Sequence, residues 1–406
     1  MTSFTTEFLG CKISMTDAQA VRERLAADGH REAPAGAAAV HVLNTCCVTA
    51  EAVAKSRKAA RRAARDAERV IVTGCAAALE GAFDGLPANV SVIARRSEHL
   101  AEAVSSAVAP LGCTGASPVP FARTRAYVKI QDGCSFSCSY CVIPQVRGAS
   151  RSRAAAAVLA EARRRAAQGH RELVLTGVNL GCFRDRAAGA DLAELLRAVA
   201  AVPGVERVRL SSIEVNHLTD ALLEAVADTK GVARHLHVPM QSGSDDVLRA
   251  MRRHYTSDRF LRAMARSRSR VPGLNLTTDV IVGHPRERDG DFGRTIEAVR
   301  EAGFTKVHVF PYSPRPGTAD AGSDEVAAAD KRRRSRILRE LSDAQGAAHR
   351  AAKIGRRELV LVEGPDGRGY GDDYTPYRVP GALAGRLAPV IGIAAGPDAV
   401  IATLCA

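Results

Sequence analysis

The chain has 406 residues and a formal net charge of +13; 46% of its residues are apolar and 25% are charged. The apolar and charged fractions are ordinary for a globular protein, and the length allows two or three domains, each with its own core. Met1–Gly10 lacks the basic start and apolar core of a signal peptide, and every long apolar run is interrupted by charge. We therefore expect a cytoplasmic protein without a membrane partner. The basic charge is compatible with a polyanion such as RNA, although composition alone favours the simpler explanation of arginine on solvated faces.

The first 112 residues alternate short apolar runs with helical stretches. The runs SFTTEFLGC, AAAVHVLNTC and RVIVTGC each have the pattern of a buried strand that ends in a turn. Helices are predicted at Thr16–Asp28 and Thr49–Glu68, and a further strand at Val90–Ile93. This alternation predicts an open, mostly parallel α/β domain. The segment Gly112–Pro120 is rich in Gly, Pro, Ser and Thr, and residues 113–124 are predicted to be a linker.

Residues 125–352 resume the alternation with longer spacing. They predict six strand–helix units, an incomplete (βα)6 version of the parallel barrel, in which functional residues lie at the carboxyl ends of the strands. The strands are predicted at Ala126–Ile130, Glu172–Thr176, Arg207–Ser211, His235–Val238, Leu274–Val282 and Lys306–Phe310. The helices are predicted at Ala154–Gln168, Asp191–Ala200, Asp220–Ala227, Asp245–Arg270 with a break near Thr256, and Gly290–Ala302.

Residues 353–406 change character again. Short strands punctuated by glycine and proline predict a small antiparallel β-barrel, a fold that often binds oligonucleotides. The preceding segment DKRRRSRILRELSDAQGAAHR is predicted to be a basic helix that closes the middle domain.

Three cysteines, Cys134, Cys138 and Cys141, lie close together just after the first predicted barrel strand. A zinc site usually takes four ligands in two pairs, and a ferredoxin run supplies four thiolates. Three thiolates suit an iron–sulfur cubane that keeps one iron open for a ligand. With Tyr140 before the last cysteine, the spacing closely resembles the radical S-adenosylmethionine superfamily. The alternative is three free cysteines or a partial zinc site.

This resemblance implies a catalytic [4Fe–4S] cluster on the three cysteines, whose open iron binds S-adenosylmethionine. The reduced cluster would cleave that cofactor to a 5′-deoxyadenosyl radical. The superfamily usually has a Gly-Gly-Glu motif near the position of Asn179, and this chain lacks the glutamate. A strand histidine such as His237 is more often a satisfied core residue, and Asp279 would serve equally as a cap. The cofactor-binding candidates are Tyr140, Thr176, Gly177, Asn179, Ser211, Glu214, His237, Gln241 and Asp279.

A second set of three cysteines lies in the N-terminal domain. Cys11, Cys46 and Cys75 each follow a predicted strand. The carboxyl ends of parallel strands share one edge of the sheet, so these thiols are expected to converge there. A buried cysteine is commonly just a small hydrophobic residue, and the first triad is what makes a second cluster the stronger interpretation.

Longer motifs point to one family. The segments GCKISMTDAQ, NTCCVTAEA, KIQDGCSFSCSYCVIPQVRGASRSR, HVPMQSGSDDVLRAMRRHYT and DVIVGHPRE together resemble the methylthiotransferases over nearly the whole chain. The resemblance implies an N-terminal domain with an auxiliary [4Fe–4S] cluster on Cys11, Cys46 and Cys75, a radical S-adenosylmethionine barrel, and a C-terminal RNA-binding TRAM barrel. The adjacent Cys47 is a departure from the family pattern, and Cys46 matches the family's ligand position.

The segments VLTGVNLG, RLSSIE and FPYSPRPGT most resemble one branch of the family. That branch adds a methylthio group to N6-threonylcarbamoyladenosine at position 37 of tRNA, next to the anticodon. The implied partners are the anticodon stem-loop and a low-potential electron donor such as flavodoxin or ferredoxin. The alternatives are the isopentenyladenosine branch, the branch that modifies ribosomal protein S12, and a non-catalytic RNA-binding protein with two zinc sites.

Two basic features are candidates for RNA contact. The first is a stripe at three- and four-residue steps, and the second is a set of side chains on the C-terminal barrel. Such a stripe is usually a solvated face, but with an RNA substrate phosphate contact becomes the better interpretation. The stripe consists of Lys55, Lys58, Arg62, Arg65 and Arg69, and the barrel set of Arg357, Arg368 and Tyr370.

Overall fold

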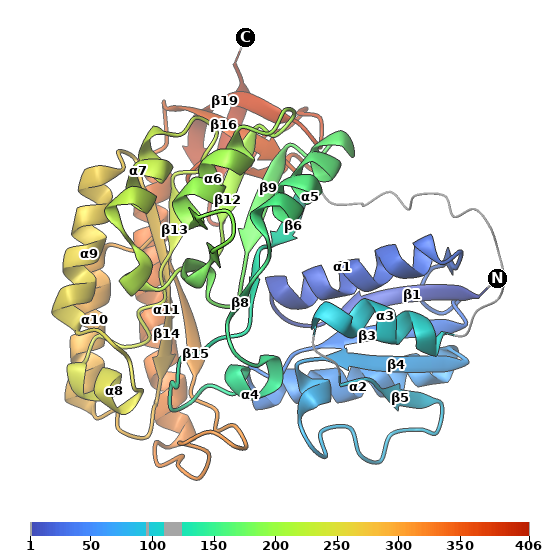
Figure 1. Cartoon of the computed structure of the whole chain (residues 1–406). Coiled ribbons are helices and arrows are strands. Elements are labelled where there is room, and N and C mark those ends of the chain that lie inside the picture. Colours follow the sequence, from blue (N-terminus) through green and yellow to red (C-terminus); the bar gives the residue numbers. More distant parts are fainter. Residues whose placement is uncertain (1, 95–96, 109–123, 406) are drawn as a thin grey trace. The chain divides into compact units, whose positions relative to one another are not determined.

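The computed structural model describes residues 2–94, 97–108 and 124–405 (Figure 1). The chain forms two compact units that do not follow chain order. The first unit contains residues 1–122, 133–149 and 313–322, and the second contains residues 123–132, 150–312 and 323–406. The linker predicted at 113–124, with Cys113, lies outside the described residues except for Thr124.

The first unit is built on a five-stranded parallel sheet with helices on both faces (Figure 1). Helices α1 (Lys12–Ala27) and α3 (Ser97–Ala107) bury their apolar residues against one face of the sheet. Helix α2 (Ala50–Asp66) covers the other face with a stripe of alanines, and Thr49 caps it by accepting a hydrogen bond from the Ala52 N–H. The open parallel α/β domain is confirmed, although α1 begins earlier than predicted. In spatial order the strands are β2 (Arg31–Glu32), β1 (Ser3–Phe8), β3 (Val40–Thr45), β4 (Arg69–Gly74) and β5 (Val90–Val92), and a short helix η1 (Ala76–Ala78) follows β4.

The second unit contains the predicted partial barrel. Its six parallel strands follow in chain order, but they form two three-stranded sheets, β6-β9-β12 and β13-β14-β15. Single bridges, including Ser212 with His237, link one sheet to the next. The strands are β6 (Arg125–Lys129), β9 (Glu172–Thr176), β12 (Arg207–Leu210), β13 (His235–His237), β14 (Asn275–Val282) and β15 (Lys306–Pro311).

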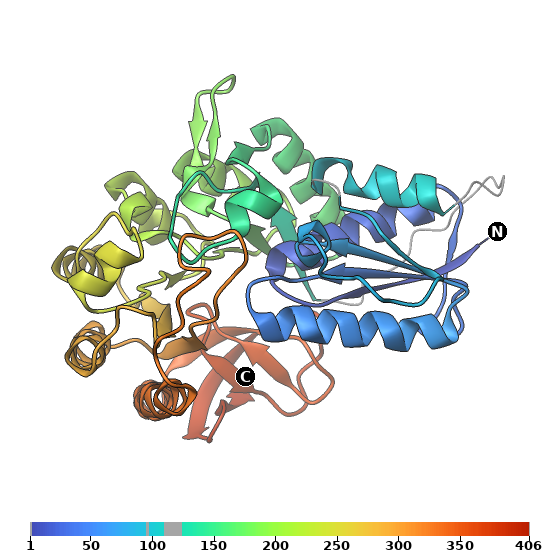
Figure 2. The same cartoon turned by 90° about the horizontal axis from the view of Figure 1, so that it is seen from below.

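The helices of this unit lie outside the strands (Figure 2). The predicted break at Thr256 is confirmed, because its side chain accepts a hydrogen bond from the Arg259 N–H and so caps a new helix. The helices are α5 (Ala155–Ala167), α6 (Leu192–Ala200), α7 (Asp220–Asp228), α8 (Asp245–Ala250), α9 (Ser257–Arg270), α10 (Asp289–Ala302) and α11 (Ala328–Ala351). Short elements are β7 (Gln131–Asp132), α4 (Ile143–Arg147), β8 (Arg151–Ser152), η2 (Leu180–Cys182), β10 (Arg184–Asp185), β11 (Ala190–Asp191) and η3 (Val215–His217). Among the described residues, no helix combines the length and apolar character that a membrane crossing requires.

The chain ends in a small closed β-barrel of five strands, as expected, but one strand pair departs from the antiparallel prediction. Strands β18 and β20 run parallel. The reason is arithmetic: five strands cannot alternate in direction around a closed ring, so one neighbouring pair must be parallel. The strands are β16 (Arg357–Val362), β17 (Arg368–Tyr370), β18 (Pro376–Arg378), β19 (Leu387–Ala395) and β20 (Val400–Leu404).

A buried ionic cluster closes the amino ends of strands β6, β9 and β12. Glu172 is fully buried, and its carboxylate lies 3.0 Å from Arg209 Nε, 3.2 Å from Arg207 Nη1 and 3.7 Å from Arg125 Nη1. Burial opposes ionisation of Glu172, but Arg209, Arg207 and Arg125 outweigh it, so the pKa of this carboxyl lies below its ordinary value. Glu363 pairs with Arg125 at 2.6 Å and Asp372 with Arg207 at 3.7 Å, so three carboxylates face three arginines.

The C-terminal barrel completes this closure with the loop that follows β17. Arg209 donates to the carbonyl oxygens of Gly371 and Asp372 at 3.1 and 3.0 Å. The Arg209 guanidinium also lies 4.7 Å from the centre of the Tyr374 ring, which stacks on Tyr370. The loop therefore covers the amino end of the partial barrel, and Tyr370 belongs to this contact.

Candidate functional site

The first cysteine triad lies at one edge of the N-terminal sheet, as the sequence predicts. Cys46 and Cys75 directly follow β3 and β4 and are buried, whereas Cys11 precedes α1 and is exposed. Gly10 has a φ of 136°, and a Cβ atom there would lie 2.6 Å from Cys46 Cβ, so only glycine lets the two turns approach this closely. Burial raises the pKa of Cys46 to about 11, and nearby Cys11 and Cys75 contribute in the same direction. The three thiols are therefore close enough to interact electrostatically.

Cys47 has a different role from its neighbour Cys46 in this geometry. It is fully buried and donates a hydrogen bond to the Cys75 sulfur. That bond raises the pKa of Cys47 and lowers the pKa of Cys75, so Cys75 is the readier thiolate of the two. The Cys47 carbonyl oxygen also accepts a hydrogen bond from Arg315 Nη1 at 3.4 Å. Cys47 thus supports Cys75 as a donor.

The second triad lies on the segment 133–149, which packs within the first unit. Cys134, Cys138 and Cys141 are all partly exposed, and so is Tyr140 between the last two. The Phe136 N–H donates to Cys134 Sγ at 3.4 Å, an arrangement that suits a thiolate. The loop is closed by the Cys134 N–H, which donates to the carbonyl oxygen at position 148 over 3.0 Å.

Both triads therefore belong to one compact unit. Val142 and Val146, from the segment of the second triad, pack in the same apolar cluster as Cys47 and Cys75. The donor set at both places is cysteine sulfur, which as thiolate is the ligand type that iron–sulfur clusters use. In a cubane each thiolate binds a different iron, so the sulfurs need not converge as tightly as the ligands of a single ion. The residues present fit two such clusters.

A buried arginine, absent from the sequence-based candidates, joins the two triads. Arg147 ends α4, downstream of Cys141. Its Nε donates to Cys75 Sγ at 3.0 Å, and its Nη2 donates to Asp17 Oδ2 at 2.8 Å. The motif PQVRG contains this residue, but nothing in local sequence shows which partner an arginine will meet across the chain.

In the second unit, Thr176, Gly177 and Asn179 lie at the carboxyl end of β9, where they were predicted. Their loop is held by Gln131, a fully buried residue that sequence reasoning missed. Gln131 Oε1 accepts from the Asn179 N–H at 2.8 Å, and its Nε2 donates to Ser150 Oγ at 2.9 Å. A Cβ on Gly177 would approach Gln131 Oε1 to 3.0 Å. Gln131 thus fixes the backbone of the loop that contains Gly177 and Asn179.

The end of β12 carries two further candidates. Ser211 directly follows the strand and is buried. Glu214 forms an ion pair with Arg253, whose guanidinium lies 5.1 Å from the centre of the Tyr255 ring. The Glu214 carboxylate is therefore already bound by a cation of this chain.

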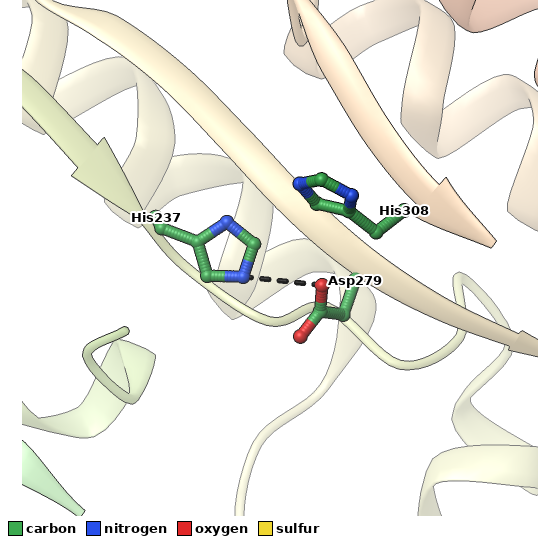
Figure 3. Close-up of side chains that lie close together, drawn as sticks. All are labelled: His237, Asp279 and His308. Atoms are coloured by element: carbon green, nitrogen blue, oxygen red, sulfur yellow. Dashed lines mark ion pairs between the residues drawn. The ribbon is translucent and has the colours of Figure 1, made fainter. Parts of the chain in front are cut away.

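Three ionisable side chains converge on the strands β13, β14 and β15. His237 Nε2 lies 3.2 Å from Asp279 Oδ1 (Figure 3). The other ring nitrogen of His237, Nδ1, forms a hydrogen bond of 2.9 Å with Thr277 Oγ1. His308, on β15, is the third member, and it was not among the residues predicted from the sequence. The possible metal-ligand atoms of the three side chains lie within 4.8 Å of one another. The two predicted residues thus form part of a polar group with mixed donor and acceptor capacity.

Gln241, the last of the predicted barrel residues, has an unusual backbone. Its φ is 65°, in the left-handed region that residues other than glycine rarely adopt. Two backbone hydrogen bonds of 2.9 Å, to the Asp279 carbonyl and from the Ile281 N–H, hold it there. Such strain is often found at functional sites.

Four members of the predicted basic stripe lie on α2 and one does not. Arg69 begins strand β4 and donates to the Ala107 carbonyl oxygen, so it leaves the helical stripe. Arg62 is exposed and pairs with Glu7 at 3.1 Å. One hollow of this surface is lined by Ala54, Arg57, Lys58, Arg61, Arg62 and Arg65.

Comparison with known proteins agrees with this arrangement. Residues 128–299 match the radical SAM superfamily, and residues 3–90 match the uncharacterized protein family UPF0004. A solved radical S-adenosylmethionine methyltransferase, TsrM from Kitasatospora setae, has a similar fold, with a TM-score of 0.59 and 16% identity over 79% of this chain and 75% of that one. The fold and the first match define a protein with a radical S-adenosylmethionine domain.

Similar sequences narrow the class. The chain is 35% identical to the threonylcarbamoyladenosine tRNA methylthiotransferase MtaB of Thermotoga maritima, over 94% of this chain and 91% of that protein. It is 33% identical to the protein of the same name from Chlamydia pneumoniae, over 91% and 88%. It is 37% identical to the tRNA-2-methylthio-N(6)-dimethylallyladenosine synthase of Sorangium cellulosum, over 91% and 84%. The chain belongs to the radical S-adenosylmethionine methylthiotransferase family.

Proposed function

We propose that this protein converts N6-threonylcarbamoyladenosine at position 37 of tRNA to its 2-methylthio derivative. The observation that carries the proposal is the gathering of two separate cysteine triads in one compact unit. Replacing hydrogen by sulfur at adenine C2 offers no acidic proton and no leaving group, so acid–base catalysis alone does not suffice. A site with two sulfur-ligated clusters suits a reaction that needs both a radical and a sulfur donor.

Each triad would hold one [4Fe–4S] cluster. Cys134, Cys138 and Cys141 would bind the cluster that, with S-adenosylmethionine, supplies the radical chemistry. In the first unit Cys11, Cys46 and Cys75 would bind the auxiliary cluster, while Cys47 donates to Cys75 without becoming a ligand. Reduction would require a low-potential donor such as flavodoxin or ferredoxin.

The carboxyl ends of the barrel strands would bind S-adenosylmethionine and orient the base. Gln131 presents the loop of Gly177 and Asn179 with its backbone fixed, which supports a role in holding the methionine part of the cofactor. His237 and Asp279 supply polar contacts, with His308 as an added member of the group. Glu214 would act through Arg253, since its carboxylate is paired with that residue. The full cofactor-binding set remains Tyr140, Thr176, Gly177, Asn179, Ser211, Glu214, His237, Gln241 and Asp279.

Binding of tRNA would use the charge of the chain in two places. The α2 side chains Lys55, Lys58, Arg62 and Arg65 offer phosphate contacts, and the C-terminal barrel of residues 353–406 offers a TRAM-like surface that includes Arg357. Arg368 pairs with two acidic residues, and Tyr370 is half-buried and stacked on Tyr374, so neither supports the proposal as strongly. A tRNA-modifying enzyme of this kind would work in the cytoplasm.

The dimethylallyladenosine (isopentenyladenosine) branch is the second candidate, because one relative with that name is 37% identical to the chain. The two branches differ in a carboxylate on the modified base. A charge-assisted contact to such a group contributes about 1.5–3 kcal/mol, enough for roughly tenfold to hundredfold selectivity.

The test is incubation of anaerobically reconstituted protein with three tRNA forms: threonylcarbamoylated, isopentenylated and unmodified. Nucleoside mass spectrometry should find the methylthio product on the first form and little on the others. Product on isopentenyladenosine alone would move the protein to the second branch. Product on none, with methylthiolation of ribosomal protein S12 in a parallel assay, would move it to the protein-modifying branch.

A further inference from the structure

A buried ion pair connects the two cysteine triads. Arg147 is 7% exposed and Asp17 is 2% exposed, and their side chains meet at 2.8 Å. A guanidinium at this depth is costly to bury unless its donors are matched. One edge is matched by the carboxylate of Asp17. The Nε–H is directed instead at a sulfur, Cys75 Sγ, at 3.0 Å.

The second partner of Arg147 is a sulfur atom, Cys75 Sγ, rather than an oxygen. A thiol is a weak acceptor, whereas a thiolate accepts a charge-assisted hydrogen bond from a guanidinium. The Asp17 carboxylate accepts a hydrogen bond from Nη2 of the same guanidinium group. This second contact restricts rotation of the guanidinium and keeps its Nε–H directed at Cys75. Hydrogen bonds to ligand sulfur are one of the ways in which proteins set the reduction potential of iron–sulfur clusters.

The pair also joins three segments that are distant in sequence. Asp17 lies on α1, which starts directly after Cys11. Cys75 follows β4, and Arg147 ends α4 on the segment that carries Cys134, Cys138 and Cys141. Each of these segments contributes a proposed ligand, so one ion pair contacts the framework of both clusters.

We propose that Arg147 and Asp17 are positioning residues for the auxiliary cluster. Arg147 holds the Cys75 sulfur in its ligand position and, as a hydrogen-bond donor, makes the cluster easier to reduce; Asp17 orients Arg147. The inference rests on the proposed function, because it needs a second cluster on Cys11, Cys46 and Cys75.

The test uses the full chain, reconstituted anaerobically, with the variants Arg147→Gln, Arg147→Lys and Asp17→Asn. Redox titration followed by electron paramagnetic resonance reports the potential of the cluster whose signal does not change when S-adenosylmethionine is added. The rate at which iron is released to a chelator reports how firmly the chain retains this cluster. Arg147→Gln should shift this potential to more negative values and release the auxiliary iron roughly tenfold to hundredfold faster. Arg147→Lys should restore part of the potential and part of the iron retention, because lysine keeps the positive charge but lacks the planar guanidinium with its two directed donors.

Asp17→Asn should change both quantities in the same direction as Arg147→Gln, but less. The matched control is Arg22→Gln, which removes another arginine–carboxylate pair of the same unit, with Glu32 at 2.6 Å, and should leave both quantities unchanged. Circular dichroism checks that each variant is folded.

Two results would overturn the inference in different ways. If the wild-type chain holds two clusters and Arg147→Gln keeps the wild-type potential and iron retention, the pair has no positioning role and the proposed function stands. If the wild-type chain holds only one cluster, the second cluster and the role of the pair both fail. An equal shift in Arg22→Gln would show a general effect of lost charge and would also refute the proposal.

Discussion

The buried arginines of the two units are matched in different ways. In the second unit, Arg207 and Arg209 direct their donors to the carboxylate of Glu172 and to carbonyl oxygens. In the first unit, Arg147 directs one donor to a carboxylate and another to a cysteine sulfur. The difference separates structure from chemistry. Arginines paired with carboxylate and carbonyl oxygens close the fold of the second unit, whereas the Arg147 donor that points at Cys75 Sγ lies at a proposed ligand.

The same contrast appears between the ends of the partial barrel. At the amino ends, charges are enclosed and covered by the loop that contains Tyr374. Toward the carboxyl ends, Gln241 has a strained backbone and His237 ends β13. Asp279 and His308, which lie within β14 and β15, join His237 in a partly exposed group (Figure 3). Substitutions at the first place should affect folding, and those at the second and at the triads should affect chemistry.

The largest expected effect is the loss of chemistry in the first unit. We expect about eight irons per reconstituted chain, two cubanes of four. Replacing Cys134, Cys138 and Cys141 by alanine should halve the iron and abolish cleavage of S-adenosylmethionine. Replacing Cys11, Cys46 and Cys75 should halve the iron but leave cleavage to deoxyadenosine. Iron analysis and chromatography of the products measure both, and loss of all cleavage in the second variant would contradict the assignment.

A large effect on folding is expected at Glu172. Glu172→Gln removes the charge that compensates Arg125, Arg207 and Arg209, and breaking a buried pair of this type costs about 3–5 kcal/mol of unfolding free energy. Chemical denaturation measures the change, and the iron content of the folded fraction should stay normal. Asp246→Asn, which removes an exposed pair with Arg249, is the control and should change little. A small effect of Glu172→Gln would show that the cluster is not needed for stability.

A pH-dependent effect is expected where the C-terminal barrel meets α11. Burial opposes ionisation of Asp373, but His349 at 3.1 Å and Lys353 at 2.6 Å outweigh it, so its pKa in the folded state lies below the ordinary value. A depressed pKa stabilises the fold above the unfolded-state pKa of about 3.9, and this contribution is lost as the pH falls further. Asp373→Asn should therefore cost about 1.5–3 kcal/mol at neutral pH and progressively less below about pH 4. Unfolding curves at several pH values test this, and a cost independent of pH would contradict it.

The smallest effect is expected at Cys47. Cys47→Ser keeps a donor beside Cys75, so the auxiliary cluster should be retained, whereas Cys46→Ala should lose it. Iron analysis of the two variants compares them directly. Loss of iron in Cys47→Ser with retention in Cys46→Ala would show that Cys47 is the ligand.

The sequence by itself determined the elements, and it predicted the sulfur ligands. Apolar runs of strand length, helical spacing and a capping residue such as Thr256 act over a few positions, so the six barrel strands and the helix break were predictable. The cysteine spacing and the methylthiotransferase motifs were equally local, and the family assignment that they implied is confirmed.

Only the tertiary structure decided which distant residues meet. Arg147 and Asp17, Gln131 and Asn179, and His308 with His237 are contacts between separate segments, and no local pattern specifies them. The packing of residues 133–149 and 313–322 with the N-terminal sheet is of the same kind. The physical reason is that local preferences act between neighbours in sequence, whereas the partner of a buried charge depends on the path of the whole chain through space.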